Sequence, residues 1–260
     1  MSSYNLKRLL QPKSIALFGG LWIENVANQI KNSNFKGNVW PINPHRKSIA
    51  GYKCFQDISD LPGVPDTAFI GVNRTKTLEI LTKLNEVGCG GATCFAAGFS
   101  EVDKYGKQLQ KKLSKASKDM PFLGPNCYGY INYLDHIHMW PDQHGGKEVE
   151  KGVAIIAQSS NIAINLTMNT RSTPIAYVLT TGNQAKIDMS DLGLAMINDK
   201  RVTAIGIYIE GFKDIKKFEK MAFSALRSNI PIVVLKSGKT DLSKKQSISH
   251  TASITGDSDI

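Results

Sequence analysis

The fold is decided by the stretch Ser14-Ile-Ala-Leu-Phe-Gly-Gly20, an apolar run that ends in two glycines and is followed by a helix-compatible segment from Ile23 to Ile30. A strand, a glycine turn and a helix in this order open an α/β unit of the nucleotide-binding kind, in which backbone N–H groups face a phosphate. The Gly-x-Gly-x-x-Gly fingerprint is incomplete, because Leu21, Trp22 and Asn25 stand where further small residues are wanted. The stretch therefore predicts an α/β fold, but by itself it does not identify the ligand.

Working outward, the pattern repeats along the first half of the chain. Apolar runs followed by turn formers occur at 38–43, 66–72, 91–97 and 121–126, and helical periodicity occupies 75–87 and 102–118. This alternation predicts a parallel sheet flanked by helices, whose ligand lies beyond the carboxyl ends of the strands. The rule places these turns on one rim: Gly19-Gly20, Asn43-Pro44, Asn73, Ala97-Gly98 and Asn126-Cys127.

The pattern restarts in the second half and predicts a second open parallel sheet. Its strands are expected at 152–157, 174–179, 202–209 and 230–235, with helices at 188–197 and 214–227. Ser159 and Ser160 follow the first of these strands, where hydroxyls and helix N–H groups can hold a phosphate. The flanking Ala157 and Asn161 do not fit the Gly-x-Ser-x-Gly turn of serine hydrolases.

Two polar residues of the second half are candidates for chemistry. His250 lies in the hydroxyl- and lysine-rich run 236–256, from which an imidazole can act as a nucleophile or an acid/base group towards anionic substrates. Glu210 ends a buried strand and could orient such an imidazole. A solvated surface histidine and a salt-bridged glutamate are the structural alternatives.

Histidines and cysteines give no convincing metal site. His136, His138 and His144 lie close together in the sequence, but no carboxylate or thiolate completes a zinc set, so a crossing segment with surface histidines is favoured. The four cysteines show no zinc spacing and suit a reducing compartment.

Composition sets the outer limits. With 260 residues, of which 42% are hydrophobic, the chain is long enough for two domains with buried cores. It has no run of about 18 uncharged apolar residues and no secretory signal, so we expect a cytoplasmic protein that makes no membrane contact. The net charge of +10 indicates either an anionic partner or only a contribution to solubility. Phosphorylated small molecules fit better than nucleic acid, because no nucleic-acid-reading motif accompanies the lysines.

Several motifs occur together in a characteristic order over nearly the whole chain: Pro12-Lys-Ser-Ile-Ala-Leu-Phe-Gly-Gly, Phe35-Lys-Gly-Asn-Val-Trp-Pro-Ile-Asn-Pro, Ala97-Gly-Phe, Gly124-Pro-Asn-Cys-Tyr-Gly, Ala157-Gln-Ser-Ser, Thr181-Gly-Asn-Gln, Tyr208-Ile-Glu-Gly-Phe and Ser249-His-Thr. With them the chain resembles the nucleoside-diphosphate-forming acyl-CoA synthetases, relatives of the succinyl-CoA synthetase α subunit. In that family a carboxylic acid is joined to coenzyme A (CoA) through an acyl phosphate, and the phosphoryl group travels on a histidine.

The resemblance implies a domain order and a set of roles. It implies a Rossmann-like CoA-binding domain over 1–130, a connecting segment over 131–151, and a flavodoxin-like domain over 152–260. His250 would be phosphorylated and Glu210 would orient it. The phosphoryl group would be cradled by Gln158, Ser159 and Ser160. CoA would be bound by Gly19, Gly20, Leu21, Asn43, Pro44, Lys47, Val72, Asn73, Ala97, Gly98, Asn126 and Cys127.

The sequence also departs from the family. The first glycine loop is short, and Ser160 stands where glycine is usual, which could tighten or block the phosphate nest. Nothing resembles an ATP-grasp domain, so we expect ATP or GTP, with Mg²⁺, to bind on an ATP-grasp domain or β subunit outside this chain. We also expect an oligomer acting on a small carboxylic acid, CoA and phosphate.

Two rival functions remain open at this stage. An NAD-dependent oxidoreductase would need an acidic residue after the second strand, where Asn43-Pro44-His45-Arg46 stands. A non-catalytic CoA-sensing module would have no chemical need for His250 and Glu210.

Overall fold

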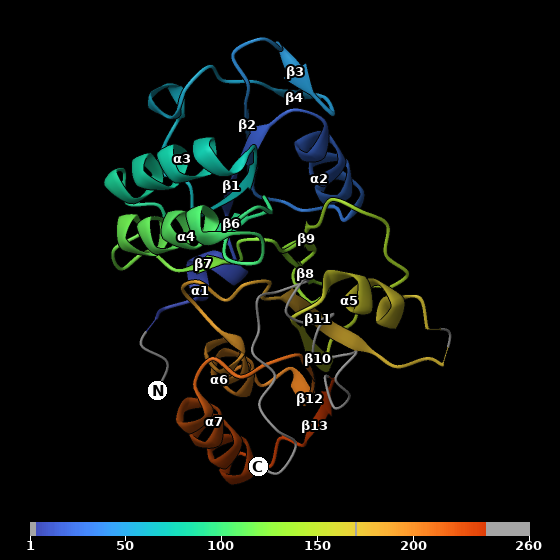
Figure 1. The fold of residues 1–260 in the computed structure, drawn as a ribbon. Coiled ribbons are helices and arrows are strands. Elements are labelled where there is room, and N and C mark those ends of the chain that lie inside the picture. Colours follow the sequence, from blue (N-terminus) through green and yellow to red (C-terminus); the bar gives the residue numbers. More distant parts are fainter. Residues whose placement is uncertain (1–3, 170, 238–260) are drawn as a thin grey trace.

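The computed structural model describes residues 4–169 and 171–237, which form two α/β halves (Figure 1). The first half is built on a parallel sheet with strand order β2-β1-β5-β6-β7. Its strands are β1 (Ser14–Gly19), β2 (Asn38–Ile42), β5 (Thr67–Gly71), β6 (Ala92–Cys94) and β7 (Phe122–Leu123). From β1 the chain continues to β2 on one side, and the later strands, beginning with β5, are added on the other side. The strand order therefore reverses between β1 and β5, and open parallel sheets bind ligands at such a point.

Helices cover both faces of this sheet. α2 (Leu21–Asn32) lies on one side, and α3 (Arg74–Glu86) and α4 (Lys104–Ala116) lie on the other (Figure 1). α2 buries residues at spacings of three and four, which makes one apolar stripe: Ile23, Val26, Ala27 and Ile30. The smaller elements are α1 (Lys7–Leu10), the hairpin β3 (Ser48–Ile49) and β4 (Tyr52–Lys53), and the 3₁₀ turn η1 (Ile58–Asp60).

The second sheet has the strand order β13-β12-β10-β11-β8-β9. Its parallel strands are β10 (Gly152–Ala157), β11 (Ile175–Thr180), β12 (Val202–Ile209) and β13 (Ile232–Lys236). Its helices are α5 (Ser160–Thr167), α6 (Met189–Ile197) and α7 (Ile215–Arg227). As the sequence predicts, α/β alternation produces a second open sheet.

This second sheet is mixed, which corrects the expectation of purely parallel strands. β8 (Tyr130–Asn132) and β9 (Ile137–Met139) pair antiparallel with each other, and β8 pairs antiparallel with β11. Both lie in or beside the stretch that the sequence analysis assigned to a connecting segment. A short turn suffices between antiparallel strands, whereas the parallel strands need their crossover helices.

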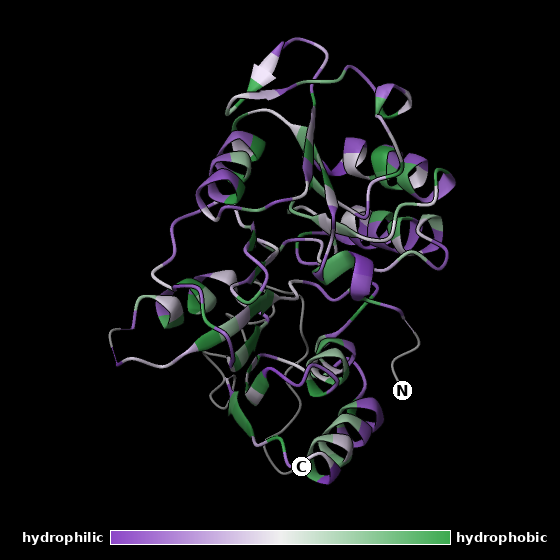
Figure 2. Ribbon diagram, turned by 180° about the vertical axis from the view of Figure 1, so that it is seen from behind, coloured by the Kyte–Doolittle hydropathy of each residue, from purple (hydrophilic) through white to green (hydrophobic). Residues whose placement is uncertain are grey.

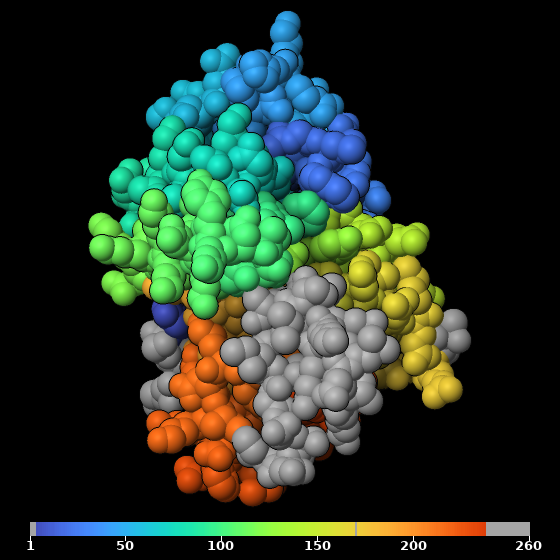
Figure 3. Space-filling model, viewed as in Figure 1, coloured from blue at the N-terminus to red at the C-terminus, as the bar shows by residue number. Residues whose placement is uncertain are grey.

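The two halves share one hydrophobic core. Ile15 and Leu17 of β1 belong to the same buried cluster as Tyr130, Ile156 and Ile207 of the second half. Figure 2 shows apolar strands inside and helices with one apolar and one polar face. The lysine-rich side of α4 is exposed and forms part of the surface seen in Figure 3. No helix in the two described ranges has the length and apolar character needed to cross a membrane.

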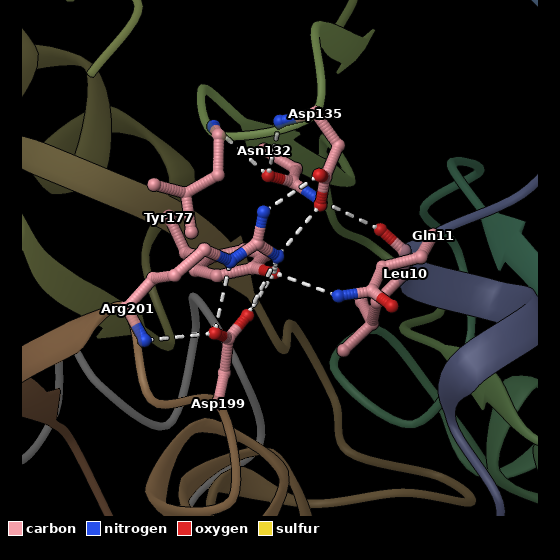
Figure 4. A network of polar contacts seen from close by, with 8 residues as sticks. Leu10, Gln11, Asn132, Asp135, Tyr177, Asp199 and Arg201 are labelled. Atoms are coloured by element: carbon pink, nitrogen blue, oxygen red, sulfur yellow. Dashed lines mark hydrogen bonds and ion pairs between the residues drawn. The ribbon is translucent and has the colours of Figure 1, made fainter. Parts of the chain in front are cut away.

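A polar network around Arg201 fastens the second half to the amino-terminal segment (Figure 4). The Arg201 guanidinium donates to both oxygens of Asp135, at 2.7 and 2.9 Å, and also to Asp199. The Tyr177 hydroxyl donates to Asp199 and accepts from the Gln11 amide. Burial alone would raise the pKa of Asp135, but hydrogen bonds from Arg201 outweigh it and the pKa is lowered.

Histidines of the crossing segment were predicted to lie on the surface, and for His138 this prediction is wrong. His138 is only 4% exposed, because β9 carries it inward against Tyr133 and His144, with ring centroids 5.3 and 4.7 Å away. Burial lowers the pKa of His138 to about 3. No group of three His, Cys, Asp or Glu side chains that could hold a metal ion occurs in the described part of the chain.

Candidate functional site

A first pocket lies at the carboxyl ends of β1, β2 and β5, where the strand order reverses. Its volume is ≈ 490 Å³, within the range of small-molecule sites. Six residues predicted to bind the cofactor line it: Gly19, Gly20, Asn43, Pro44, Val72 and Asn73. The prediction that these turns share one rim therefore holds for this group.

Close backbone contacts shape the floor of the first pocket. Gly19 has φ +141°, and a Cβ built on it would lie 2.5 Å from the Gly71 carbonyl oxygen, so the chain here needs glycine. The Asn43 amide donates to the Gly19 carbonyl at 2.7 Å, which ties the end of β2 to the turn. The Asn73 side chain accepts from the Lys76 N–H and caps α3, whose N-terminus therefore opens at the pocket.

Basic side chains form part of the lining of the first pocket. Lys76, Lys83 and His45 line it, and Lys83 pairs with Asp57 at 3.2 Å. Lys76 lies in the first turn of α3, and a lysine beside a helix N-terminus favours a phosphorylated ligand, whereas Lys83 lies in the last turn. Sequence reasoning missed Lys76 and Lys83, although their spacing of seven residues puts them on one face of the predicted helix.

Leu21 and Lys47, which were also predicted to bind CoA, are not part of the lining of the first pocket. Leu21 is 71% exposed at the first position of α2. Lys47 is exposed beyond the end of β2, and its carbonyl accepts from the Cys54 N–H.

A second pocket, of ≈ 250 Å³, lies between the two halves. The first half contributes Phe95, Ala97, Asn126, Cys127 and Tyr128, and the second half contributes Gln158, Ser160 and Asn161. The Ser160 hydroxyl accepts from the Tyr128 N–H at 3.1 Å, so the start of α5 is joined directly to the rim of the first half. Because the first N–H groups of a helix have no partner within it, this arrangement suits an anion.

Gln158 joins the carboxyl ends of β10 and β12. Its side-chain oxygen accepts from the backbone N–H groups of Glu210 and Gly211, at 2.5 and 2.9 Å. The Glu210 side chain is buried, and the Glu210 carbonyl accepts from Lys236 at 3.2 Å. The backbone of Glu210 is thus hydrogen-bonded to Gln158, which lines the second pocket.

The remaining predicted residues have different surroundings. Ser159 is buried at the N-cap position of α5. The Gly98 N–H donates to Glu101, and its carbonyl accepts from Arg74. His250 lies outside the described residues.

The Cys127 thiol is buried, and this burial raises its pKa to about 12. It therefore stays protonated at neutral pH and cannot serve as a thiolate nucleophile.

The turn after β11 is a further contact between the halves that sequence reasoning did not assign to the site. The Asn183 amide donates to Glu101 at 2.5 Å and to Gln110 at 3.0 Å. Its backbone N–H donates to the Pro125 carbonyl. The motif Thr181-Gly-Asn-Gln was visible in the sequence, but its partners are distant in the chain.

Comparison with known proteins agrees with this architecture. Residues 13–133 match the CoA binding domain family, and residues 150–260 match the succinyl-CoA ligase like flavodoxin domain family. The chain therefore carries a CoA binding domain followed by a succinyl-CoA ligase like flavodoxin domain. These two domain matches agree with the two successive open sheets, and the match of the first half to a CoA binding domain argues against the oxidoreductase alternative.

Related proteins are longer than this chain. The ADP-forming acetate–CoA ligase of Methanocaldococcus jannaschii is 34% identical over 98% of this chain and 36% of its own length. The α subunit of ADP-forming acetate–CoA ligase II of Pyrococcus furiosus is 28% identical over 96% of this chain and 56% of its own length.

A solved structure shares the fold. The dinucleotide forming acetyl-coenzyme A synthetase 1 of Ca. Korarchaeum cryptofilum, in complex with phosphate and ADP, superposes with a TM-score of 0.85 at 30% identity. The match covers 97% of this chain and 56% of that one.

Proposed function

We propose that this chain is the CoA-binding and phosphohistidine-carrying part of a nucleoside-diphosphate-forming acid–CoA ligase. The observation that carries the proposal is the second pocket, where the CoA-binding half meets the N-terminus of α5. Matches to a CoA binding domain and to ADP-forming ligases support the use of CoA and a nucleotide.

The first pocket fits the nucleotide part of CoA. A Cβ built on Gly20 would meet nothing within 4 Å, so a ligand can approach the backbone there, and the start of α3 supplies N–H groups. Lys76 supplies positive charge for phosphates, and Lys83 lies in the same lining paired with Asp57. CoA, once bound, provides the thiol that becomes the thioester.

The second pocket is where we place group transfer. His250 accepts a phosphoryl group and passes it to the carboxylate of the acid, and the resulting acyl phosphate is attacked by the thiol with release of phosphate. Two transfers replace one difficult displacement. The N–H groups at the start of α5 and the hydroxyl of Ser160 stabilise the phosphoryl oxygens, and Glu210 orients the imidazole.

The nucleotide is assigned to a partner. We propose that ATP or GTP, with Mg²⁺, binds to an ATP-grasp domain or β subunit, as relatives named α subunits suggest. The chain would then act in an oligomer, within the cytoplasm, on a small carboxylic acid. The domain limits 1–130, 131–151 and 152–260 remain part of this proposal.

The test is to map the phosphoryl group. The full chain together with its ATP-grasp partner is incubated with γ-³²P-ATP and Mg²⁺, and protein-bound label is followed in acid and in base. We expect an acid-labile, base-stable label that His250→Ala abolishes and the neighbouring Ser249→Ala retains. Glu210→Gln should slow labelling by about 10²-fold, a typical loss for a residue supporting acid–base chemistry.

Two outcomes would contradict the proposal. Labelling that persists in His250→Ala would remove the histidine role, and the absence of acid-labile label in the wild type would favour a CoA-sensing module. Full ATP-dependent turnover by residues 1–260 without any partner would remove the need for an ATP-grasp domain.

A further inference from the structure

Aromatic side chains connect the glycine turn of the first pocket with the wall of the second pocket. The first pocket includes Gly20, and the second includes Phe95 and Tyr128. Trp22 follows Gly20 by two positions in α2, and its ring lies 4.9 Å from that of Phe95. The chain therefore places an indole between the glycine turn of one pocket and the wall of the other.

These rings form a continuous row. Phe95 lies 5.7 Å from Tyr128, and Tyr128 lies 5.4 Å from the buried Trp140. The fully buried Phe69, 5.7 Å from Phe95, anchors the row to the sheet. Centroid distances of this size are typical of favourable contacts between aromatic rings. Each ring of the row is therefore held in place by its neighbours.

The outer end of the row is exposed. Trp22 is 42% exposed and its neighbour Leu21 is 71% exposed, although both open a helix beside a polar turn. Exposed large apolar side chains gathered beside a pocket mark a surface that contacts a ligand. The buried stripe of α2 begins at Ile23, so packing of the helix does not require an indole at position 22.

We propose that Trp22 and Phe95 form the apolar surface that contacts the pantetheine arm of CoA between the two pockets. This inference rests on the proposed function, which assigns the nucleotide part of CoA to the first pocket and thioester chemistry to the second. A ligand that occupies both must be held between them, and the methyl and methylene groups of the arm match an aromatic wall. Trp22 thus takes the place of the small loop residues that the fingerprint would require.

The experiment compares CoA with its nucleotide fragment, adenosine 3′-phosphate 5′-diphosphate, which has the nucleotide part of CoA with all three phosphates and no arm. Dissociation constants are measured calorimetrically for the full chain and for Trp22→Ala. We expect Trp22→Ala to bind CoA about tenfold more weakly, equivalent to about 1.4 kcal/mol, and to bind the nucleotide fragment within about twofold of the wild type.

A matched control is Phe223→Ala, which removes an aromatic side chain that is 62% exposed on α7 and outside both pockets. It should change neither constant. Trp22→Phe, which keeps a ring, should recover most of the affinity for CoA.

A second measurement needs no variant. Of the three tryptophans, Trp22 is exposed, Trp40 is half-buried and Trp140 is buried, so CoA should shift the tryptophan emission of the wild type more than the nucleotide fragment does. This measurement decides the matter if Trp22→Ala fails to fold.

Three results would overturn the proposal. Unchanged CoA affinity in Trp22→Ala would show that the indole does not contact the arm. Equal weakening for both ligands would assign Trp22 to the nucleotide pocket. Failure of the wild type to bind either ligand would refute the CoA site itself, and with it this inference.

Discussion

At the scale of single residues, burial changes what a side chain can do. The Nε2 atom of His138 is buried, and within the described ranges no hydrogen bond satisfies it. Its neighbours are Tyr133, His144 and, at 3.8 Å, a carboxylate oxygen of Glu148. Burial is the main cause of the lowered pKa of His138, and charge on His144 and His136 acts in the same direction, so the neutral imidazole is favoured.

This residue predicts a pH dependence of stability. The pKa of His138 is about 3 in the folded chain, below the value of about 6.5 for an exposed histidine, so the unfolded state binds more protons between these values. The contribution of the neutral His138 side chain to the free energy of unfolding is therefore complete above about pH 6.5 and is lost as the pH falls. The free energy of unfolding should drop by about 1.4 kcal/mol between about pH 7.5 and pH 5.5 on account of His138.

Urea unfolding at the two pH values measures this loss, and His138→Gln should reduce it. The exposed His45 provides the control, since His45→Gln should keep the wild-type pH dependence. Burial also lowers the pKa of His144, which remains in both variants and accounts for part of what is left. An identical pH dependence in wild type and His138→Gln would show that His138 is already solvated.

At the scale of elements, the site depends on how strand ends are joined. β10 and β12 are neighbours in the sheet, and Gln158 connects their carboxyl ends by accepting two backbone N–H groups. Gln158→Ala removes this acceptor and leaves buried donors to be satisfied in another way. We expect a loss of about 1–3 kcal/mol in the free energy of unfolding, measured by urea denaturation.

Asn161→Ala is the comparison for this change, because Asn161 is an exposed amide in the first turn of α5. It should alter stability by no more than about 0.5 kcal/mol. If Gln158→Ala were equally neutral, water would be replacing the side chain and the junction of β10 and β12 would not depend on it.

At the scale of the whole molecule, the shared core makes the two halves one cooperative unit. One buried cluster joins Leu17 of β1 to Ile156 of β10, and Asn183 adds polar contacts across the same boundary. We expect a single calorimetric transition, with calorimetric and van't Hoff enthalpies that agree. Two resolved transitions in the wild type would show that the halves unfold independently.

Asn183→Ala tests the polar part of this boundary. It removes the contacts to Glu101 and Gln110 but leaves the shared core intact. The transition should therefore stay single and move down by about 2–4 °C for each kcal/mol lost.

Much of the fold could be predicted from the sequence, because it follows from local patterns. The apolar run 14–18 becomes β1 (Ser14–Gly19), and the periodic segment 188–197 becomes α6 (Met189–Ile197). The glycine turn and the alternation of strands with helices also predicted which strand ends share a rim. The antiparallel β8 and β9 were missed because each is only three residues long and has no clear alternation.

The sequence by itself therefore determined the elements, their order and the rim on which a ligand can bind, since these depend on periodicity and on turn chemistry within a few residues. Only the tertiary structure decided that the rim divides into two pockets, that Ser160 meets Tyr128, and that Trp22 lies against Phe95. These contacts join residues far apart in the chain. They exist only after strand order and the packing of the two halves have fixed where each strand ends.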